Sequence, residues 1–305
     1  MVLGATVLTG AVAPFLSSYY AGLLAQVLIF AIFAMSLDLL VGFMGLPSLG
    51  HSSFFGVGAY TTAMLALHYS HNFWLCAALG IFFALVTAAF FGLLVLRTGG
   101  SSFLMITLAL SQILWGIAFK WRAVTGGEDG LSGISRTSMG IPWDLTNSHG
   151  FLALVLIFFA VSGIVIAIYN LSPFGLALQG IRESESRMRS LGYNVWLYKY
   201  LGHAFAAGVA GFSGVLFVFY NSFVSPNYLS VGFSAKALLM VILGGSGTLL
   251  GPFLGSLIVV GMENVLSTVT ERWMMIMGAT YVFVVLFFPK GLLGSIGKLK
   301  KGGEG

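Results

Sequence analysis

Residues 20–42 read YAGLLAQVLIFAIFAMSLDLLVG, an apolar stretch in which Asp38 is the only charged residue. A helix needs about 20 consecutive, mostly apolar residues to cross the hydrocarbon core of a membrane, and this stretch is long enough. The sequence around it has the same character, because Asp38 is the only formal charge between Met1 and Leu96. This part of the chain therefore predicts several membrane-spanning helices in succession.

The whole composition indicates an all-α, polytopic transmembrane helical bundle of about 8–10 spans. The chain has 305 residues, of which 58% are hydrophobic and 8% charged, whereas soluble domains carry roughly 25% charged residues. We therefore exclude a soluble enzyme and treat residues 1–305 as one transmembrane domain. The net charge of +5 does not indicate a nucleic-acid partner, because basic residues of membrane proteins gather in cytoplasmic loops. The single Cys76 excludes a disulfide scaffold within the chain.

Apolar runs separated by polar breaks predict the individual spans. They are residues 2–16, 20–42, 48–69, 73–96, 101–120, 150–170, 200–221, 234–247, 248–268 and 272–289. Residues 234–268 form either two short spans or one re-entrant hairpin that turns around Gly244–Gly247. Two long connections, 121–149 and 171–199, and a tail, 290–305, lie outside the membrane.

The distribution of Lys and Arg predicts the orientation, because these residues are enriched in cytoplasmic loops. With the 171–199 connection and the tail on the same side, that side carries Arg97, Arg182, Arg187, Arg189, Lys199, Lys290, Lys298, Lys300 and Lys301. The opposite side carries only Lys120, Arg122, Arg136, Lys236 and Arg272. We therefore expect the 171–199 connection and both termini in the cytoplasm and the 121–149 loop outside.

Small residues recur at intervals of four, which lets helix backbones approach closely in a membrane. The series is Gly247, Gly251 and Gly255, with the pairs Ala207/Gly211 and Ala210/Gly214 one span earlier. The pattern predicts tight packing within one bundle. Association of either face with another membrane chain is the alternative.

The segment 172–199, SPFGLALQGIRESESRMRSLGYNVWLYK, predicts a short amphipathic helix on the cytoplasmic side. Ser172 and Pro173 are a helix start signal, and Gly192 is suited to end the helix. Helical spacing places Ile181, Ser184, Met188 and Leu191 in one thin apolar stripe. The same spacing gives two i,i+4 charge pairs, Glu183/Arg187 and Glu185/Arg189. This pattern favours docking to a soluble partner, and a helix that lies in the lipid headgroups is the alternative.

Five segments resemble, in matching order, the permease subunits of branched-chain amino-acid ABC importers, the LivM-like family. They are SLDLLVGFMGLPSLGHSSFFGVGAY (36–60), TGGEDGLSGI (125–134), residues 172–195, LGGSGTLLGPFLGS (243–256) and PKGLLG (289–294). The resemblance covers most of the chain from Ser36 to Gly294. The sequence departs from the family at Arg187-Met188, where relatives usually have Ala-Ala.

The resemblance implies a permease subunit of an ATP-driven importer for a small amino acid, most often Leu, Ile or Val, in the bacterial inner membrane. Its partners would be a second homologous permease, two ABC ATPase subunits and a periplasmic substrate-binding protein. The chain would be no enzyme and would hold no cofactor or metal. No G-x-x-x-x-G-K followed by Ser or Thr occurs in it, so ATP and Mg²⁺ would bind the ATPase subunits. Urea, short amides or other small acids are alternative substrates, and an ion-coupled secondary transporter is the alternative from another class.

The resemblance also assigns roles to residues of the two long connections. The coupling helix that contacts the ATPase would carry Gly175, Arg182, Glu183, Glu185, Arg187, Met188, Leu191 and Gly192. In the 121–149 loop, Glu128 and Asp129 would meet the binding protein, and a Gly-rich surface turn is the alternative. Trp121, Arg122, Arg136 and Trp143 lie in the same loop.

Polar residues inside the spans are candidates for the translocation pathway, because such residues are costly in lipid and usually face a cavity or a partner. Asp38 and Glu263 are the charged candidates. The plainer interpretations are that Asp38 bonds to nearby backbone or serine and that Glu263 extends to the membrane surface.

Two Pro/Gly-rich interruptions also predict irregular backbone that borders the pathway. The first contains Ser48, His51 and Ser52, and the second, 244–252, contains Ser246. Thr107 and Gln112 in the 101–120 span complete the candidate set. The alternatives are packing bends, a structural role for His51, and interhelical hydrogen bonds from Thr107 and Gln112.

Overall fold

Helix α2 (Ser18–Asp38) is the central helix in this computed structural model, which describes residues 6, 9–10, 17–69, 72–134, 147–287 and 291. Its side chains are apolar on every side, and such a helix is stable only where lipid or other helices surround it. Helices α7 (Ser148–Leu171), α10 (Val195–Asn221), α11 (Val231–Gly244) and α12 (Gly251–Val269) pack around it. A helix that is apolar on all sides therefore becomes the core of the bundle.

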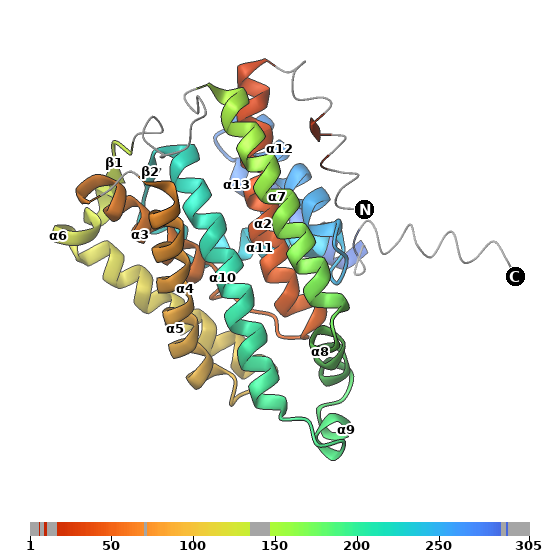
Figure 1. The fold of residues 1–305 in the computed structure, drawn as a ribbon. Coiled ribbons are helices and arrows are strands. Elements are labelled where there is room, and N and C mark those ends of the chain that lie inside the picture. Colours follow the sequence, from red (N-terminus) through yellow and green to blue (C-terminus); the bar gives the residue numbers. More distant parts are fainter. Residues whose placement is uncertain are drawn as a thin grey trace, which may run out of the picture.

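The remaining long helices extend the bundle on both sides of this core (Figure 1). Helices α3 (Ser52–His68) and α4 (Phe73–Val95) pack against α10, and α5 (Ser101–Lys120) lies beyond them at one edge. Helix α13 (Trp273–Phe287) contacts α11 and α12. At one end of the bundle lie two short helices, α8 (Pro173–Glu183) and α9 (Glu185–Ser190).

The structure confirms the all-α prediction and most of the predicted spans. Six described helices are long and apolar enough to cross a membrane: Ser18–Phe43, Phe73–Val95, Ser101–Lys120, Ser148–Leu171, Val195–Asn221 and Gly251–Val269. The first of them ends in a π-helical turn, η2 (Leu39–Phe43). The predicted span 2–16 lies outside the described residues except for residues 6, 9 and 10.

Two of the predicted spans are shorter helices that begin inside the bundle. Helix α3 has 17 residues and starts only at Ser52, so the expected span 48–69 loses its first turn. Helix α11 has 14 residues, which is about 21 Å and less than the roughly 30 Å of a hydrocarbon core. Helices α11 and α12 form a hairpin whose turn contains Gly247, and the Gly247 N–H donates to Asp38 at the end of α2. Residues 234–268 thus turn near Gly247, as predicted, and of the two helices only α12 is long enough to cross a membrane.

The small residues that recur at intervals of four pack inside the bundle, which is the prediction of tight packing within one bundle. A Cβ added to Gly255 would lie 1.8 Å from the carbonyl oxygen of Met240 in α11, and one added to Gly214 would lie 2.1 Å from the carbonyl oxygen of Phe55 in α3. These backbones touch because glycine leaves no side chain between them. Neither face is therefore free for another chain.

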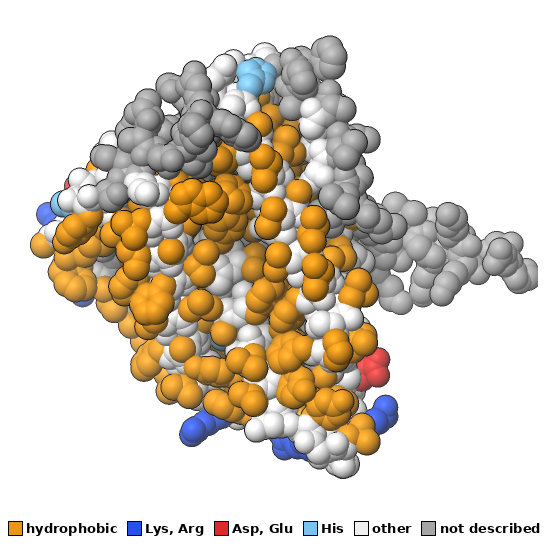
Figure 2. Space-filling model, viewed as in Figure 1, with side chains coloured by type: hydrophobic (Ala, Val, Ile, Leu, Met, Phe, Trp, Pro, Cys, Tyr) orange, Lys and Arg blue, Asp and Glu red, His pale blue; other side chains and the backbone are white. Residues whose placement is uncertain are grey.

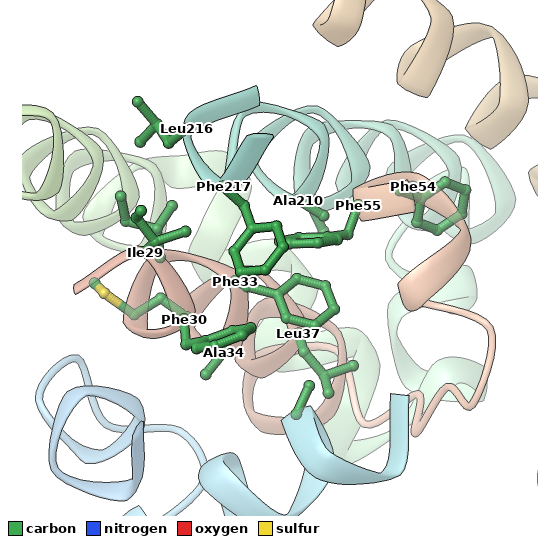
Figure 3. Close-up of a cluster of buried hydrophobic side chains, with 14 of the residues drawn as sticks. Ile29, Phe30, Phe33, Ala34, Leu37, Phe54, Phe55, Ala210, Leu216 and Phe217 are labelled. Carbon is green, nitrogen blue, oxygen red and sulfur yellow. The ribbon is translucent and has the colours of Figure 1, made fainter. Parts of the chain in front are cut away.

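Aromatic side chains fill the space where α2, α3, α10 and α11 meet (Figure 3). The ring of Phe55 lies 4.8 Å from that of Phe33, 5.4 Å from that of Phe217 and 4.9 Å from that of Phe233, measured between ring centroids. Offset and tilted contacts of this kind are the favourable geometries for aromatic pairs. This cluster fixes the positions of the helix ends described below.

Short elements connect the helices at the other end of the bundle. They are α6 (Arg122–Thr125), the 3₁₀ turns η3 (Gly127–Asp129) and η4 (Pro226–Leu229), and the strands β1 (Leu131–Ser132) and β2 (Phe223–Val224). The two strands pair antiparallel, with Leu131 opposite Val224 and Ser132 opposite Phe223. This pair joins the loop after α5 to the segment that leads into α11.

Candidate functional site

Three buried serines surround the place where α3 and α11 begin. The Ser52 N–H donates to Ser234 Oγ at 3.0 Å, and the Ser234 hydroxyl donates to Ser52 Oγ at 2.7 Å. The Ser52 hydroxyl donates to the Ser230 carbonyl at 3.0 Å, and the Ser111 hydroxyl of α5 donates to the Leu229 carbonyl at 3.0 Å. We call Ser52, Ser111 and Ser234 the serine cluster.

The serine cluster lies level with the middle of a helix that is long enough to cross a membrane. Ser111 is in the centre of the spanning helix α5, about 15 Å from each of its ends. All three serines are fully buried. Non-helical backbone is tolerated at this depth only where protein or a cavity surrounds it, and here the hydroxyls satisfy the backbone groups at the start of two helices. Discontinuous helices that begin at the midplane mark binding sites in many transporters.

The first interruption, Met44–His51, packs against the last turns of α2. His51 Nε2 lies 2.8 Å from the Ser36 hydroxyl, and its ring stacks on that of Phe33 at a centroid distance of 5.5 Å. The predicted candidates Ser48 and Thr107 are buried beside it and bond to nearby backbone, since Ser48 accepts from the Gly50 N–H and Thr107 donates to the Leu104 carbonyl. These contacts fit the structural interpretation of His51.

The second interruption, residues 245–250, lies at the end of α2 rather than beside the first. Asp38 is buried, and its Oδ1 accepts from the Gly247 N–H at 2.8 Å. Asp38 therefore bonds to backbone, which was the plainer of its two interpretations. Ser246 is exposed at the tip of the turn.

Arg182 of α8 joins this junction from the side of the short helices. Its Nη1 donates to the carbonyl oxygen of Gly42 in the π-helical turn. Gly45, with φ +68°, leaves room for the same side chain, because an added Cβ would lie 2.9 Å from Arg182 Cγ. The end of α2, the α11–α12 turn and α8 thus meet at Asp38, Gly42 and Arg182, which we call the junction.

Residues 172–192, which hold the predicted coupling helix and which we call the coupling segment, form two helices and not the single helix that the spacing predicts. As expected, the Ser172 hydroxyl accepts from the Gly175 N–H at 3.2 Å and α8 starts at Pro173. The chain then leaves the helix at Ser184, whose φ is −160°, and Ser184 caps α9 by accepting from the Arg187 N–H. The predicted stripe is interrupted for this reason.

The members of the coupling segment are divided between the interior and the surface. Ile181 and Met188 are buried, and Gly175 packs on the backbone of Asn170. Lys199 of α10 forms an ion pair with Glu185, and Glu185 also pairs with Arg189 at 3.5 Å. The exposed set is Arg182, Glu183, Glu185, Arg187, Arg189, Leu191 and Gly192. Leu191 is 66% exposed, so it is a surface residue and does not belong to the buried stripe.

Two predicted pathway residues lie away from the serine cluster. Glu263 of α12 forms an ion pair with Lys236 of α11, and Lys236 Nζ lies 4.7 Å from the centroid of the Phe30 ring. Glu263 is therefore paired with a neighbouring helix instead of extending to the membrane surface. Gln112 follows Ser111 on α5 but is exposed on the outside of the helix.

The outer loop candidates form a defined corner. Glu128 and Asp129 are exposed on η3, between α6 and strand β1. Gly130 has φ +69°, and an added Cβ would lie 2.2 Å from the carbonyl oxygen of Val224, so the corner is held against the chain before η4. Arg136 and Trp143 lie outside the described residues.

Sequence reasoning missed Ser230 and Ser234 as partners of Ser52. The signal available was Ser225-Pro226 and the Ser230-x-x-x-Ser234 spacing, which mark a helix start within a region of apolar residues. The second interruption that matches the Ser52 region is thus 225–230 and not 244–252.

The chain matches the family model described as the permease component of the branched-chain amino acid transport system over residues 19–285. It is similar to the high-affinity branched-chain amino acid transport system permease protein LivM of Escherichia coli K12, with 31% identity over 288 residues that cover 87% of this chain and 68% of the relative. It is also similar to the permease protein LivH of Salmonella typhimurium LT2, with 24% identity over 294 residues, 87% of this chain and 91% of the relative. No solved structure matches the chain.

Proposed function

This chain belongs to the family of branched-chain amino acid transport permeases, and from that membership we propose that separate ATPase subunits drive it through α8 and α9. The chain is a multi-pass membrane permease component and no enzyme of its own. ATP and Mg²⁺ would bind the ATPase subunits. A periplasmic binding protein and a second permease would complete the importer.

The surface formed by α8 and α9 carries this proposal. It presents exposed charged groups of both signs, Glu183, Arg187 and Arg189, on a base that is anchored by buried Ile181 and Met188 and by the Lys199–Glu185 ion pair. A partner that pushes on such a surface moves α8 and α9 together with the start of α10. A helix that merely lay on lipid would present a broad apolar face instead.

The junction supports a route from this surface into the membrane. A shift of α8 moves Arg182, which is bonded to Gly42 at the end of α2. The same turn of α2 holds the α11–α12 turn through Asp38 and Gly247. Helix α11 begins at the serine cluster, so displacement at the junction reaches the middle of the membrane along one short, stiff helix.

The serine cluster is the position at which we place the closed point of the pathway. Its hydroxyls bond to one another and to backbone, and they are the kind of uncharged group that a zwitterion passes without tight binding. When α11 moves relative to α3, the Ser52–Ser234 bonds break and hydroxyls become available to substrate. Lys199, α9 and the chain termini lie on the cytoplasmic side in this proposal, and Glu128 and Asp129 meet the binding protein.

The test is transport by the reconstituted complex of both permeases and both ATPase subunits, with leucine and the binding protein outside. The double charge reversal Arg187→Glu and Arg189→Glu should abolish most ATP-dependent uptake and release the ATPase from the complex, whereas Arg272→Glu at the other end of the bundle should do neither. Unchanged uptake in the double variant would show that the ATPase does not act through α9. Uptake by this chain alone without ATP would instead support an ion-coupled transporter.

A further inference from the structure

Helix α5 exposes more of itself than any other described span. Of its apolar stretch 22% is buried, against 83% for α2, and it lies at the edge of the bundle (Figure 1). The exposed residues within α4 and α7 are apolar, with Phe82, Phe90 and Val161 among them, as expected for a surface that faces lipid. Apolar side chains cover most of the face shown in Figure 2. Helix α5 differs from that pattern in three ways.

The first difference is Gln112. Its side chain is exposed next to the midplane residue Ser111, and it makes no hydrogen bond to any residue that the structure describes. An amide has two donor hydrogens and an acceptor oxygen, and lipid tails offer none of these a partner. In membranes such side chains bond across helix–helix interfaces.

The second difference is a hollow on the same side of the helix. Residues Met105, Ala109, Gln112 and Gly116 follow one another at helical spacing, and all are at least partly exposed. A hollow of about 560 Å³ opens beside Gly116 and is lined by Ile113, Ile117, Lys120 and Trp121. Nothing lies within 4 Å of a Cβ added to Gly116. Small residues beside a hydrogen-bonding side chain are what a close helix contact in a membrane requires.

The third difference is charge at the end of this face. Lys120 and Arg122 are both exposed, and no ion pair in the described residues engages either of them. A second copy of this chain related by an axis along the membrane normal would bring these positive charges together, which is unfavourable. A distinct chain with an acidic side chain there would neutralise them.

We propose that the outer face of α5, from Met105 to Lys120, is the interface with a second permease of the same family that is distinct from this chain. The relatives include two different permeases, LivM and LivH, so a related chain of this kind is the natural occupant. The facing helix would place an amide or hydroxyl opposite Gln112 and an acidic group opposite Lys120. This inference rests on the proposed function, because it takes the chain to work as part of a transporter complex.

Site-specific photo-cross-linking tests the proposal in the assembled transporter in membranes. The photoreactive amino acid p-benzoylphenylalanine replaces Gln112, and in a control it replaces Gly278, which also has open space around it on α13. The expected result is a covalent product at position 112 but not at 278, whose second component is identified by mass spectrometry as a different branched-chain permease. Adducts of position 112 with lipid only, with an ATPase subunit or with this chain itself overturn the proposal.

A pair of substitutions gives an independent measurement. Gly116→Leu fits within this chain but fills the hollow, and Gln112→Leu removes the amide without adding bulk. Each should reduce the second permease that co-purifies at a fixed concentration at least about threefold, while Gly278→Leu should not. A lipid-facing α5 predicts unchanged or better yield for Gln112→Leu. If the second permease stays bound in both variants while the ATPase still binds α9, the proposed interface is wrong and the proposed function stands. If the ATPase does not bind the unmodified complex, the proposed function itself is wrong.

Discussion

Ser52 and Ser53 are neighbours at the start of α3 with different surroundings. Ser52 bonds to Ser234, Ser230 and Leu229, whereas the buried Ser53 hydroxyl has no partner among the described residues. Loss of a buried hydroxyl with good partners costs about 1–2 kcal/mol, and loss of an unpartnered one is nearly neutral. A comparison of the two positions therefore separates the contribution of the hydrogen bonds to stability from the effect of replacing any buried serine.

We therefore expect Ser52→Ala to lower the free energy of unfolding by about 1–2 kcal/mol, because the Ser234 hydroxyl and the Ser230 carbonyl lose their partner. Ser53→Ala should change it by less than about 0.5 kcal/mol or raise it. Thermal unfolding of the purified protein in detergent measures both. Equal effects of the two variants would show that the hydrogen bonds of Ser52 in the serine cluster do not stabilise the fold.

Gly255 and Gly261 form a second matched pair, on α12. Gly255→Leu should destabilise the fold by at least about 1–3 kcal/mol, because the new Cβ meets the Met240 carbonyl and the helices must separate. Nothing lies within 4 Å of a Cβ at Gly261, so Gly261→Leu should be tolerated and gain about 0.5–1 kcal/mol of helix propensity. The monodisperse fraction in size-exclusion chromatography reports both, and wild-type behaviour of Gly255→Leu would contradict the packing.

At the residue scale, the sequence located the polar residues but not their partners. Asp38 stands out in any apolar run, yet its partner Gly247 is a backbone N–H that no side-chain pattern marks. Lys236 was assigned to an outer connection, and its pairing with Glu263 requires the spatial neighbourhood of α11 and α12. Gln112 was a candidate for the pathway or for an interhelical hydrogen bond, and the structure places its side chain on the exposed side of α5.

At the scale of elements, the Lys199–Glu185 ion pair holds α9 against α10. Lys199 has 9% of its side chain exposed and Glu185 46%. Breaking a fully buried pair by removing one partner costs about 3–5 kcal/mol, and the cost here is lower because water screens Glu185. The Glu185–Arg189 pair is mostly exposed, with 68% of the Arg189 side chain accessible, and contributes little.

Glu185→Gln should therefore release α9 and leave Lys199 without its counter-charge, at a cost of about 1–3 kcal/mol. Arg189→Gln should change stability by less than about 1 kcal/mol, and the double variant Glu185→Gln with Lys199→Met should recover much of the loss. Hydrogen exchange of the Glu185–Ser190 amides follows the release directly. Equal protection in wild type and Glu185→Gln would show that the pair does not anchor α9.

The break at Ser184 shows what helical spacing alone misses. The helical spacing of the apolar Ile181, Met188 and Leu191 suits one helix, and Ser184 is not a strong breaker inside a helix. Ser followed by Glu185 is also a good helix start, and the buried Met188 together with the Lys199 ion pair favours the second arrangement. The local sequence allows either one continuous helix or two helices that meet at Ser184, and the tertiary contacts favour two.

At the scale of the whole molecule, the bundle has two different ends. Lys and Arg side chains gather at the end that carries α8 and α9 (Figure 2), which agrees with the bias of basic residues toward the cytoplasm. The opposite end carries α6, η3 and the β1–β2 pair. We propose from this difference that α8 and α9 lie on the cytoplasmic side, and this orientation is directly measurable.

In intact cells, an impermeant maleimide should label Glu128→Cys and not Ser186→Cys, each in a Cys76→Ala background. Both positions are exposed, so a difference reports the side of the membrane and not burial. Permeabilised cells, in which both should react, are the control. Labelling of residue 186 from outside would invert the topology, and the charge-reversal experiment on α9 would then lose its rationale.

The positions and order of the six long helices in the described residues followed from the sequence, because a hydrocarbon layer imposes a minimum apolar length. The short helices α3 and α11 did not follow, since a helix that begins inside the layer has the same composition as one that crosses it. Their true starts depend on hydroxyls and carbonyls that come from four separate elements.

The antiparallel pairing of Leu131–Ser132 with Phe223–Val224 has a mechanical consequence. Because paired strands resist separation, a force on Glu128 and Asp129 is transmitted through β1 to β2, the strand that precedes η4. That strand stands only seven positions before Val231, where α11 starts. In the proposed importer, substrate delivery from outside and the push from the ATPase would thus act on opposite ends of the fourteen-residue helix α11.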